Sequence, residues 1–256
     1  MLTASDQNLT IDICAAGHIP SYGDLMNKLL LIITTCFLAV SSFANETYTG
    51  KVVKLADGDT LQFLPSAGGK PFKVRMIAID TAETHFSTPK GGTLSQGYWG
   101  EMGAKQLEKF VAVGDEAELE VYGEDRYGRK LGRVFKNGED LNLKMIRSGW
   151  AALYMICDAN KPCKSGALSQ QDLKKYREAC MDAVQEGLGL FDASNPVPEL
   201  PFLFRASAAG NPPNKFVADL SSGTYVNPAE FPLVNVCNRL FYYNQADAVQ
   251  NGFNPK

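Results

Sequence analysis

Three short runs between residues 48 and 79 alternate between hydrophobic and polar positions, as half-buried strands do. Tyr48 to Lys54 and Thr60 to Leu64 flank Asp57-Gly58, and an Asp-Gly pair between two alternating runs predicts a hairpin. Phe72 to Ile79 is the third run. Together these runs predict a meander of three strands.

The hydrophobic period then changes to about 3.6 residues, which predicts helices, and later returns to alternation. The expected helices are Glu101 to Val113, Asp140 to Ser148 and Ser169 to Glu186, and the expected strands are Ala117 to Tyr122 and Lys130 to Phe135. Five strands with a helix between the third and fourth describe a small barrel of the oligonucleotide-binding (OB) type. The predicted fold class is α+β, mainly β: a five-stranded OB-fold barrel with flanking helices and a small C-terminal module.

The last quarter of the chain has a different composition. Residues 193–215 are rich in Pro and Asn and predict a linker. Residues 216–256 contain a strand-like run, Arg239 to Tyr242, and a short helix pattern, Gln245 to Gln250. We expect a small C-terminal module there, and a tail without stable structure is the alternative.

The N-terminal region predicts export. A basic start at Met26-Asn27-Lys28 precedes the apolar run Leu29 to Val40, and Ser42-Phe43-Ala44 has small residues where a signal peptidase reads them. We expect a signal peptide over residues 26–44, a periplasmic or secreted protein, and no stable membrane association after cleavage. Residues 1–25 are expected to be a mis-assigned or disordered leader, and a real polar leader that lengthens the signal is the alternative.

The net charge limits how the chain can bind a polyanion. The full sequence has 25 basic and 28 acidic residues, and removal of residues 1–44 takes away one basic and three acidic ones. The remaining chain is nearly neutral, whereas proteins that hold nucleic acid by counterion release alone carry broad basic surfaces. Any such binding must therefore depend on local placement of arginine and lysine.

Four cysteines follow the predicted cleavage site: Cys157, Cys163, Cys180 and Cys237. An even number in an oxidising compartment predicts two disulfides. Three pairings are possible. We favour Cys157 with Cys163, which closes a small loop, and Cys180 with Cys237; four buried free thiols are the alternative.

Three stretches contain most of the candidate chemistry: Asp57-Gly58-Asp59-Thr60, Arg75 to Glu83, and Asp125 to Arg129. They supply carboxylates for a hard metal ion and arginines for a phosphate, a combination suited to phosphodiester cleavage. The two histidines are His18 and His85, and His18 precedes the predicted cleavage site. A catalytic system built on a Ser/His or Cys/His pair is therefore not expected.

In their order and spacing, these stretches resemble the staphylococcal nuclease (thermonuclease) family, over a domain at residues 46–192. The resemblance implies a Ca²⁺-dependent phosphodiesterase that hydrolyses DNA and RNA, single-stranded above all, with little sequence specificity and leaves 3′-phosphates. It is expected to act as a monomer. The alternative is a non-catalytic OB-fold module that binds nucleic acid or protein.

The resemblance also implies a Ca²⁺ site. Asp59 and Asp80 match the family's two carboxylate ligands, and Thr81 matches the residue whose backbone carbonyl completes the protein's contribution. Water and substrate oxygens would fill the remaining positions, because Ca²⁺ takes about six to eight oxygen ligands. Asp57 is expected just outside the ligands, where it adds negative potential.

Further roles follow from the same resemblance. Glu83 matches the catalytic carboxylate, as base or as positioner of the attacking water. Arg75 and Arg129 match the arginines that bracket the scissile phosphate. The expected substrate-binding residues are Arg126, Tyr127 and Tyr154. For Tyr154, a packed position at the rim of the site is the alternative to base stacking.

Overall fold

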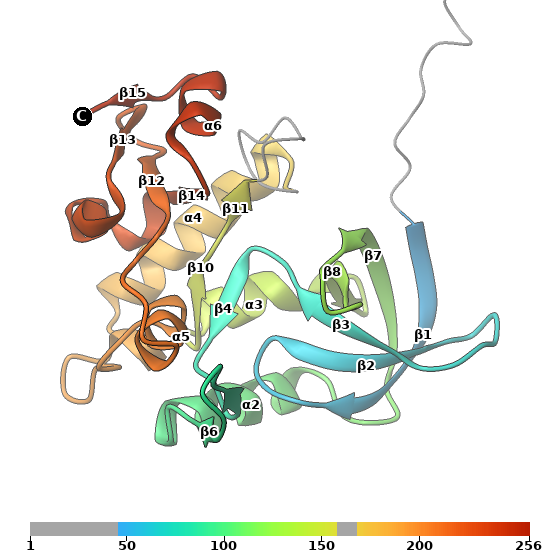
Figure 1. The fold of residues 1–256 in the computed structure, drawn as a ribbon. Coiled ribbons are helices and arrows are strands. Elements are labelled where there is room, and N and C mark those ends of the chain that lie inside the picture. Colours follow the sequence, from blue (N-terminus) through green and yellow to red (C-terminus); the bar gives the residue numbers. More distant parts are fainter. Residues whose placement is uncertain (1–45, 158–167) are drawn as a thin grey trace, which may run out of the picture. The chain divides into compact units, whose positions relative to one another are not determined.

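The computed structural model describes residues 46–157 and 168–256 (Figure 1). The predictions for residues 1–25, residues 26–44 and Cys163 lie outside these ranges. Within them, no helix has both the length and the apolar composition that crossing a bilayer requires.

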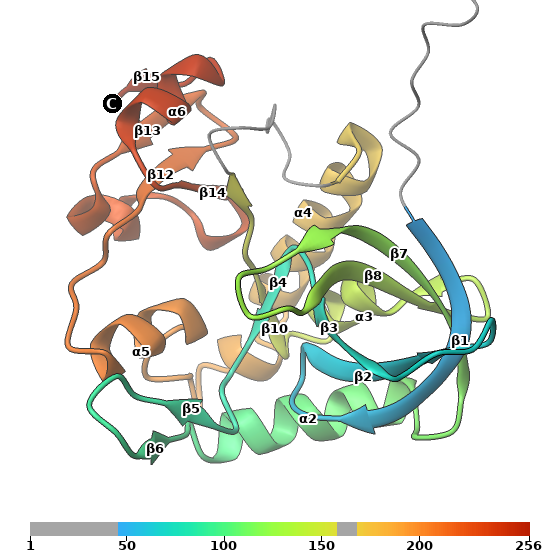
Figure 2. The same ribbon diagram turned by 45° about the vertical axis from the view of Figure 1, so that its right-hand side comes forward.

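Five strands form a closed barrel, as the alternating runs predict. They are β1 (Glu46–Leu55), β2 (Thr60–Pro65), β3 (Phe72–Met76), β7 (Glu116–Glu124) and β8 (Lys130–Lys136). Neighbouring strands pair in the order β3-β2-β1-β7-β8, and β3 also pairs with β8 in parallel, which closes the barrel. The predicted five-stranded OB-fold barrel with flanking helices is confirmed (Figures 1 and 2).

The inward positions of these strands are fully buried, which explains the period of two in the sequence. Alternate residues such as Leu61 and Phe63 in β2, Val74 and Met76 in β3, and Leu119 in β7 have no exposed surface. Burial of each such side chain contributes about 1.5–3 kcal/mol relative to exposure. The predicted hairpin across Asp57-Gly58 is also confirmed, because β1 and β2 pair in antiparallel fashion.

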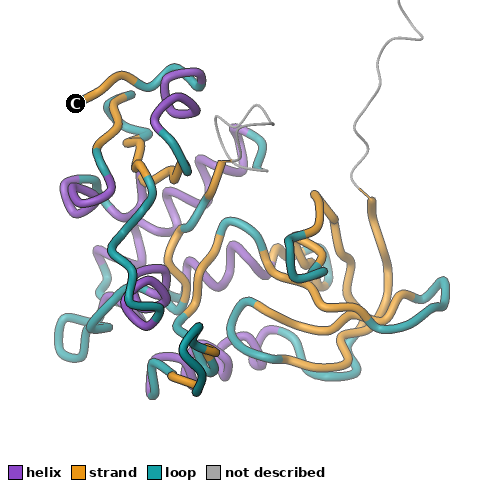
Figure 3. The backbone as a smooth tube through the Cα atoms, viewed as in Figure 1, coloured by secondary structure: helices purple, strands orange, loops and turns teal. Residues whose placement is uncertain are grey.

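Helices α2 (Tyr98–Phe110) and α3 (Leu141–Arg147) lie beside the barrel, and α4 (Gln170–Gln185) packs against α3 (Figure 3). Side chains cap two of them, since Asp140 accepts from Leu143 N and Ser169 accepts from Asp172 N. Helix α2 begins and ends three residues earlier than predicted. The extended backbone of Val111, whose side chain is buried in the core, ends the helix at Phe110.

The third predicted strand, Phe72 to Ile79, is interrupted. The chain turns after Met76 at Ala78, which has a φ of 62°, and continues as β4 (Ile79–Thr81). Strand β4 leaves the barrel sheet and pairs with β10 (Ala151–Leu153) instead. The buried amide of Asn142 fixes this turn by donating to the carbonyl of Ile77 at 2.9 Å.

The C-terminal residues add strands to the part of the chain that precedes them. Strand β11 (Ile156–Cys157) pairs in parallel with β14 (Arg239–Tyr242), and the sheet order is β11-β14-β12-β13-β15. The segment 193–215, predicted as a linker, contains a helix, α5 (Pro201–Ala208). The remaining elements are β5 (Phe86–Ser87), β6 (Thr93–Leu94), β9 (Glu139–Asp140), η1 (Gly189–Phe191), β12 (Phe216–Asp219), β13 (Thr224–Val226), η2 (Pro228–Leu233), η3 (Val236–Asn238), α6 (Gln245–Gln250) and β15 (Asn254–Pro255).

A disulfide joins the C-terminal part to the helix that precedes it. Cys180 in α4 and Cys237 in η3 are bonded, and both are buried. This confirms one of the two pairings favoured from the sequence. Cys157 is also disulfide-bonded, and its predicted partner, Cys163, is outside the described residues.

Replacing both cysteines of the Cys180–Cys237 pair with alanine is expected to lower the free energy of unfolding by about 2–4 kcal/mol. The bond spans 57 residues of sequence, so its loss restores considerable freedom to the unfolded chain. Chemical denaturation of the variant and of the wild-type protein checks this. An unchanged unfolding midpoint would contradict it.

Candidate active site

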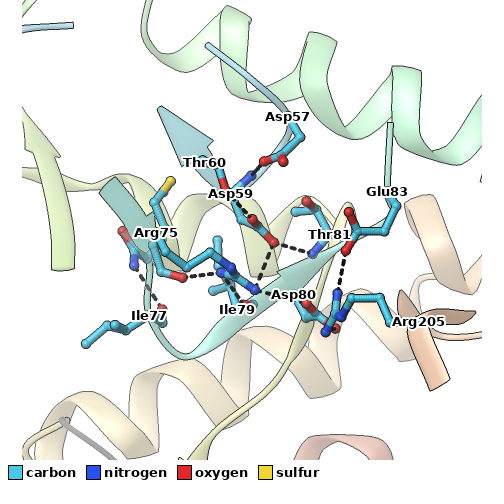
Figure 4. Close-up of polar contacts among 12 residues, drawn as sticks. Asp57, Asp59, Thr60, Arg75, Ile77, Ile79, Asp80, Thr81, Glu83 and Arg205 are labelled. Atoms are coloured by element: carbon cyan, nitrogen blue, oxygen red, sulfur yellow. Dashed lines mark hydrogen bonds and ion pairs between the residues drawn. The ribbon is translucent and has the colours of Figure 1, made fainter. Parts of the chain in front are cut away.

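Two buried carboxylates converge on one arginine (Figure 4). Asp59 follows the β1–β2 turn and is 5% exposed, and Asp80 lies in β4 and is 0% exposed. Arg75 Nη2 lies 3.1 Å from Asp59 Oδ2 and 3.0 Å from Asp80 Oδ1. The barrel and the strand that leaves it therefore meet at a shared cationic nitrogen.

The backbone holds Arg75 in this position. Its Nη1 donates to the carbonyl of Met76 and, at 3.0 Å, to that of Ile79. Burial opposes the charge on the guanidinium, but Asp59 and Asp80 more than offset it and raise the pKa of Arg75. Arg75 therefore stays protonated and oriented, and it also fixes the turn between β3 and β4.

Two glycines let the site's segments approach closely. A Cβ on Gly58 would lie 2.9 Å from the side chain of Thr81, and a Cβ on Gly100 would lie 2.5 Å from the carbonyl oxygen of Glu83. At the first contact, the amide of Thr81 donates to Asp59 Oδ2 at 2.9 Å. The missing side chains thus permit the loop before β2 to reach β4, and α2 to reach the backbone of Glu83.

Glu83 is held from its backbone and from its side chain. Its amide donates to Gln96 Oε1 at 3.0 Å, and its Oε1 lies 2.7 Å from Arg205 Nη1. Burial raises the pKa of Glu83, while the charge of Arg205 acts in the opposite direction. The carboxylate is therefore confined beside a guanidinium.

Several carboxyl groups lie close together in this site. Burial, followed by repulsion from Asp59, raises the pKa of Asp57 to about 7. Burial also raises the pKa of Asp80, and Arg205 and Arg75 oppose that rise. Four carboxyl groups thus share one region with two guanidinium groups, an arrangement that favours binding of an additional cation.

Arg205 was missed in the sequence. It lies in α5, within the predicted linker, and its Nη2 is 2.9 Å from Asp80 Oδ2. Pro201 at the start of α5 is a helix-start signal and an apolar run follows it, so the helix could have been found. The contacts of Arg205 with Asp80 and Glu83 could not have been predicted, because these carboxylates are more than 120 positions away in the sequence.

Arg129 belongs to a second group, at the β7–β8 turn. Asp125 organises the turn by accepting from the amides of Tyr127 and Arg129, and its Oδ2 accepts from Arg129 Nε at 2.8 Å. Arg126 and Arg129 both lie over the exposed ring of Tyr127, at 5.1 and 5.7 Å from its centroid. Two cations and an aromatic face are therefore presented together.

The pairing of β3 with β8 connects the two groups. Strands β3 and β8 are parallel, and Arg75 is opposite Leu131, two residues after Arg129. The structure thus brings five predicted site residues together. Arg75 contacts Asp59 and Asp80, and Thr81 donates to Asp59. Glu83 is joined to Asp80 through Arg205. The structure places Arg126, Tyr127 and Arg129 on the turn just before β8, with Arg129 paired to Asp125.

Tyr154 has a packed environment. Its ring stacks on Phe202 of α5 with a centroid distance of 5.5 Å and an interplanar angle of 11°, and Phe241 lies 4.9 Å away. Its amide donates to the carbonyl of Ala78 at 3.0 Å. The side chain proposed to stack on a base thus stacks on the chain's own helix.

The side chains of this site offer the oxygen ligands that a hard cation prefers. Asp59 and Asp80 offer carboxylate oxygens that already converge on one cationic nitrogen, and hard divalent cations prefer oxygen ligands. Over residues 46–157 and 168–256, no three His, Cys, Asp or Glu side chains are arranged as a complete metal site. Two carboxylates and a backbone carbonyl would therefore need oxygens from water or substrate.

Comparison with known proteins shows which proteins this chain is similar to. A family model described as staphylococcal nuclease homologue matches residues 73–190. "Endonuclease YhcR" of Bacillus subtilis is 29% identical over 213 residues, which cover 82% of this chain and 17% of that protein. An "Uncharacterized endonuclease" of Haemophilus influenzae is 32% identical over 173 residues, covering 68% of this chain and 80% of the relative.

The chain thus spans most of one similar endonuclease but only a small part of another, much longer one. The barrel fold and the carboxylates beside Arg75 are consistent with the family that the sequence match indicates. The chain belongs to the staphylococcal nuclease family.

Proposed function

We propose that this chain is an exported, Ca²⁺-dependent nuclease that hydrolyses DNA and RNA with little sequence specificity and leaves 3′-phosphates. The observation that carries the proposal is the convergence of Asp59 and Asp80 on Arg75. Carboxylates for a cation and a guanidinium for a phosphate lie within one buried cluster. That combination suits phosphodiester hydrolysis.

Asp59 and Asp80, with the backbone carbonyl of Thr81, would hold the Ca²⁺ ion. When bound, the ion supplies positive charge for a phosphate oxygen and for the attacking water. The excess of carboxyl groups over guanidinium groups supports this assignment, because a divalent cation offsets the remaining negative charge.

Glu83 would accept the proton of the attacking water or hold that water in line. Its carboxylate is fixed beside the cluster by Gln96 and Arg205. The pKa of Glu83 is raised by burial, which strengthens a carboxylate as a base near neutral pH. A positioned carboxylate of this kind contributes about 10²–10⁴-fold to a rate.

Arg75 and Arg129 would stabilise the charge that develops on the phosphate. Arg75 is already oriented by the carbonyls of Met76 and Ile79. Arg129 is held by Asp125 just before the start of β8, the strand next to β3. Planar guanidinium groups suit this role because each offers two parallel donors to phosphate oxygens.

The β7–β8 turn would bind the nucleotide beside the cleaved bond. Tyr127 is 69% exposed, and the guanidinium groups of Arg126 and Arg129 lie over its ring. An aromatic face accepts any base and arginines accept any phosphate, so low sequence specificity follows, with a preference for single strands whose bases are accessible. Tyr154 would contact a base only after Phe202 leaves its ring.

Export to the periplasm or the medium remains part of the proposal. It is supported by the signal-like sequence at residues 26–44 and by the Cys180–Cys237 disulfide. Disulfides of this kind persist in oxidising compartments. We further propose that the mature chain acts as a monomer without a membrane anchor.

Ca²⁺ dependence is tested with the mature protein, residues 45–256. Denatured DNA and RNA are each incubated with it in Ca²⁺ and in chelator, and the product ends are analysed. Cleavage to 3′-phosphate ends only in the presence of Ca²⁺ is expected. Equal cleavage in chelator would overturn the metal assignment, and products with 5′-phosphates would overturn the proposed chemistry.

Glu83→Gln and Arg129→Ala are each expected to lower kcat about a hundredfold or more, because each removes one preorganised proton-transfer or electrostatic group. Steady-state kinetics at saturating Ca²⁺ and substrate measures the effect. Lys144→Ala, which removes the cation of an ion pair between Lys144 of α3 and Glu139 of β9, is the control and should retain activity. Wild-type turnover in either site variant would remove that residue from the reaction.

Asp125→Ala is expected to lower kcat about tenfold and to cost about 1–2 kcal/mol of stability, because the β7–β8 turn loses an acceptor and Arg129 its partner. Glu124→Ala is the matched control, since the neighbouring carboxylate makes only an exposed ion pair with Lys130. Equal kinetics for the two variants would show that Asp125 does not position Arg129.

A further inference from the structure

A helix beyond the family match supplies an arginine to the nuclease site. The family model ends at residue 190, and α5 begins at Pro201. Arg205 of this helix reaches Asp80 Oδ2 through Nη2 at 2.9 Å and Glu83 Oε1 through Nη1 at 2.7 Å (Figure 4). One planar group therefore joins the proposed metal ligand to the proposed catalytic carboxylate.

Several contacts hold α5 in place independently of Arg205. Phe202 stacks on Tyr154, and the ring of Phe204 lies 6.3 Å from that of Phe86 in an edge-on arrangement. The buried Gln96 connects the helix to the site, because its Nε2 donates to the carbonyl of Glu199 at 2.8 Å. The same side chain accepts from the amide of Glu83 at 3.0 Å. Ring packing and the side-chain amide of Gln96, which bonds both Glu83 and Glu199, thus hold the helix beside Glu83.

The burial of this contact distinguishes it from an ordinary surface ion pair. The side chain of Asp80 is 0% exposed, that of Glu83 16% and that of Arg205 26%. Exposed pairs are worth little because water screens them. In a buried pair, by contrast, a bidentate guanidinium sets the orientation of the groups it bridges.

The charge and the geometry of Arg205 have separate consequences. Its positive charge beside Asp80 must oppose binding of a second cation to that carboxylate. Its two-nitrogen fork must hold Glu83 at a fixed position relative to Asp80, as partners of ligand and catalytic carboxylates commonly do. Removing Arg205 should therefore strengthen cation binding and weaken catalysis, an opposite pair of effects that loss of folding does not produce.

We propose that Arg205 is a positioning residue of this nuclease site, which orients Glu83 relative to Asp80 and weakens the hold of Asp80 on the divalent cation. The inference rests on the proposed function, since it takes Asp80 as a cation ligand and Glu83 as the catalytic carboxylate. It extends the active site beyond the family domain to α5.

The test compares Arg205→Gln, Arg205→Lys and wild type in two measurements. Isothermal titration with Ca²⁺, without nucleic acid, should give a Kd about tenfold lower for Arg205→Gln, because one positive charge is removed next to Asp80. Arg205→Lys should keep a Kd near that of wild type. Kinetics on single-stranded DNA at saturating Ca²⁺ should show kcat lowered about tenfold to a hundredfold in both variants, with KM little changed.

Two controls separate positioning from docking of the helix. Ser207→Ala removes a hydroxyl of α5 that donates to Glu199, and it should leave Kd and kcat unchanged. Arg205→Gln in a Glu83→Gln background should lower kcat no further, because a residue that acts through Glu83 has no effect once Glu83 is removed.

Three outcomes would overturn the inference: unchanged kcat in Arg205→Gln, additive losses in the double variant, or weaker Ca²⁺ binding together with a lower melting temperature in both Arg205 variants. The last outcome would mean that Arg205 only anchors the helix. A wild-type protein that binds Ca²⁺ without cleaving nucleic acid would instead refute the proposed function, while the titration would still report whether Arg205 opposes the cation.

Discussion

The contact of Arg75 with Asp59 and Asp80 is the interaction on which the rest of the site depends. Two carboxylates in a nearly dry environment repel one another, and a shared guanidinium nitrogen at 3.0–3.1 Å stabilises them there. Arg75 is in turn held by the carbonyls of the turn that follows it. The same residue thus links the barrel wall, the turn and the two carboxylates, which explains how negative charge can be buried at the end of a hydrophobic core.

Closure of the barrel determines where this contact forms. The parallel pairing of β3 with β8 ends at Met76, and the turn at Ala78 directs the chain into β4. The buried side chain of Asn142 satisfies the carbonyl that this turn leaves inside the protein. Asp80 and Glu83 therefore owe their positions to an irregularity in a strand, supported by a side chain from α3.

The residues beyond the family domain are integrated with it in three ways. They extend a sheet from β11, they are bonded to α4 through Cys180–Cys237, and they place Arg205 against Asp80 and Glu83. A nuclease domain of this family can thus acquire site residues from sequence that follows it. The stacking of Phe202 on Tyr154 adds a ring contact between the same segment and the family domain.

The sequence by itself determined the local features: the alternating strands, the Asp-Gly hairpin, the helix caps and the family motif with Asp59, Asp80, Glu83 and Arg75. Each depends on neighbours within a few residues, whose spacing is visible in the chain. Only the tertiary structure decided that the third strand breaks at Ala78, that Tyr154 is covered, and that Arg205 joins the site. These outcomes depend on packing between segments as far apart as 125 residues. The pattern of hydrophobic and polar positions does not specify which distant surfaces will be in contact.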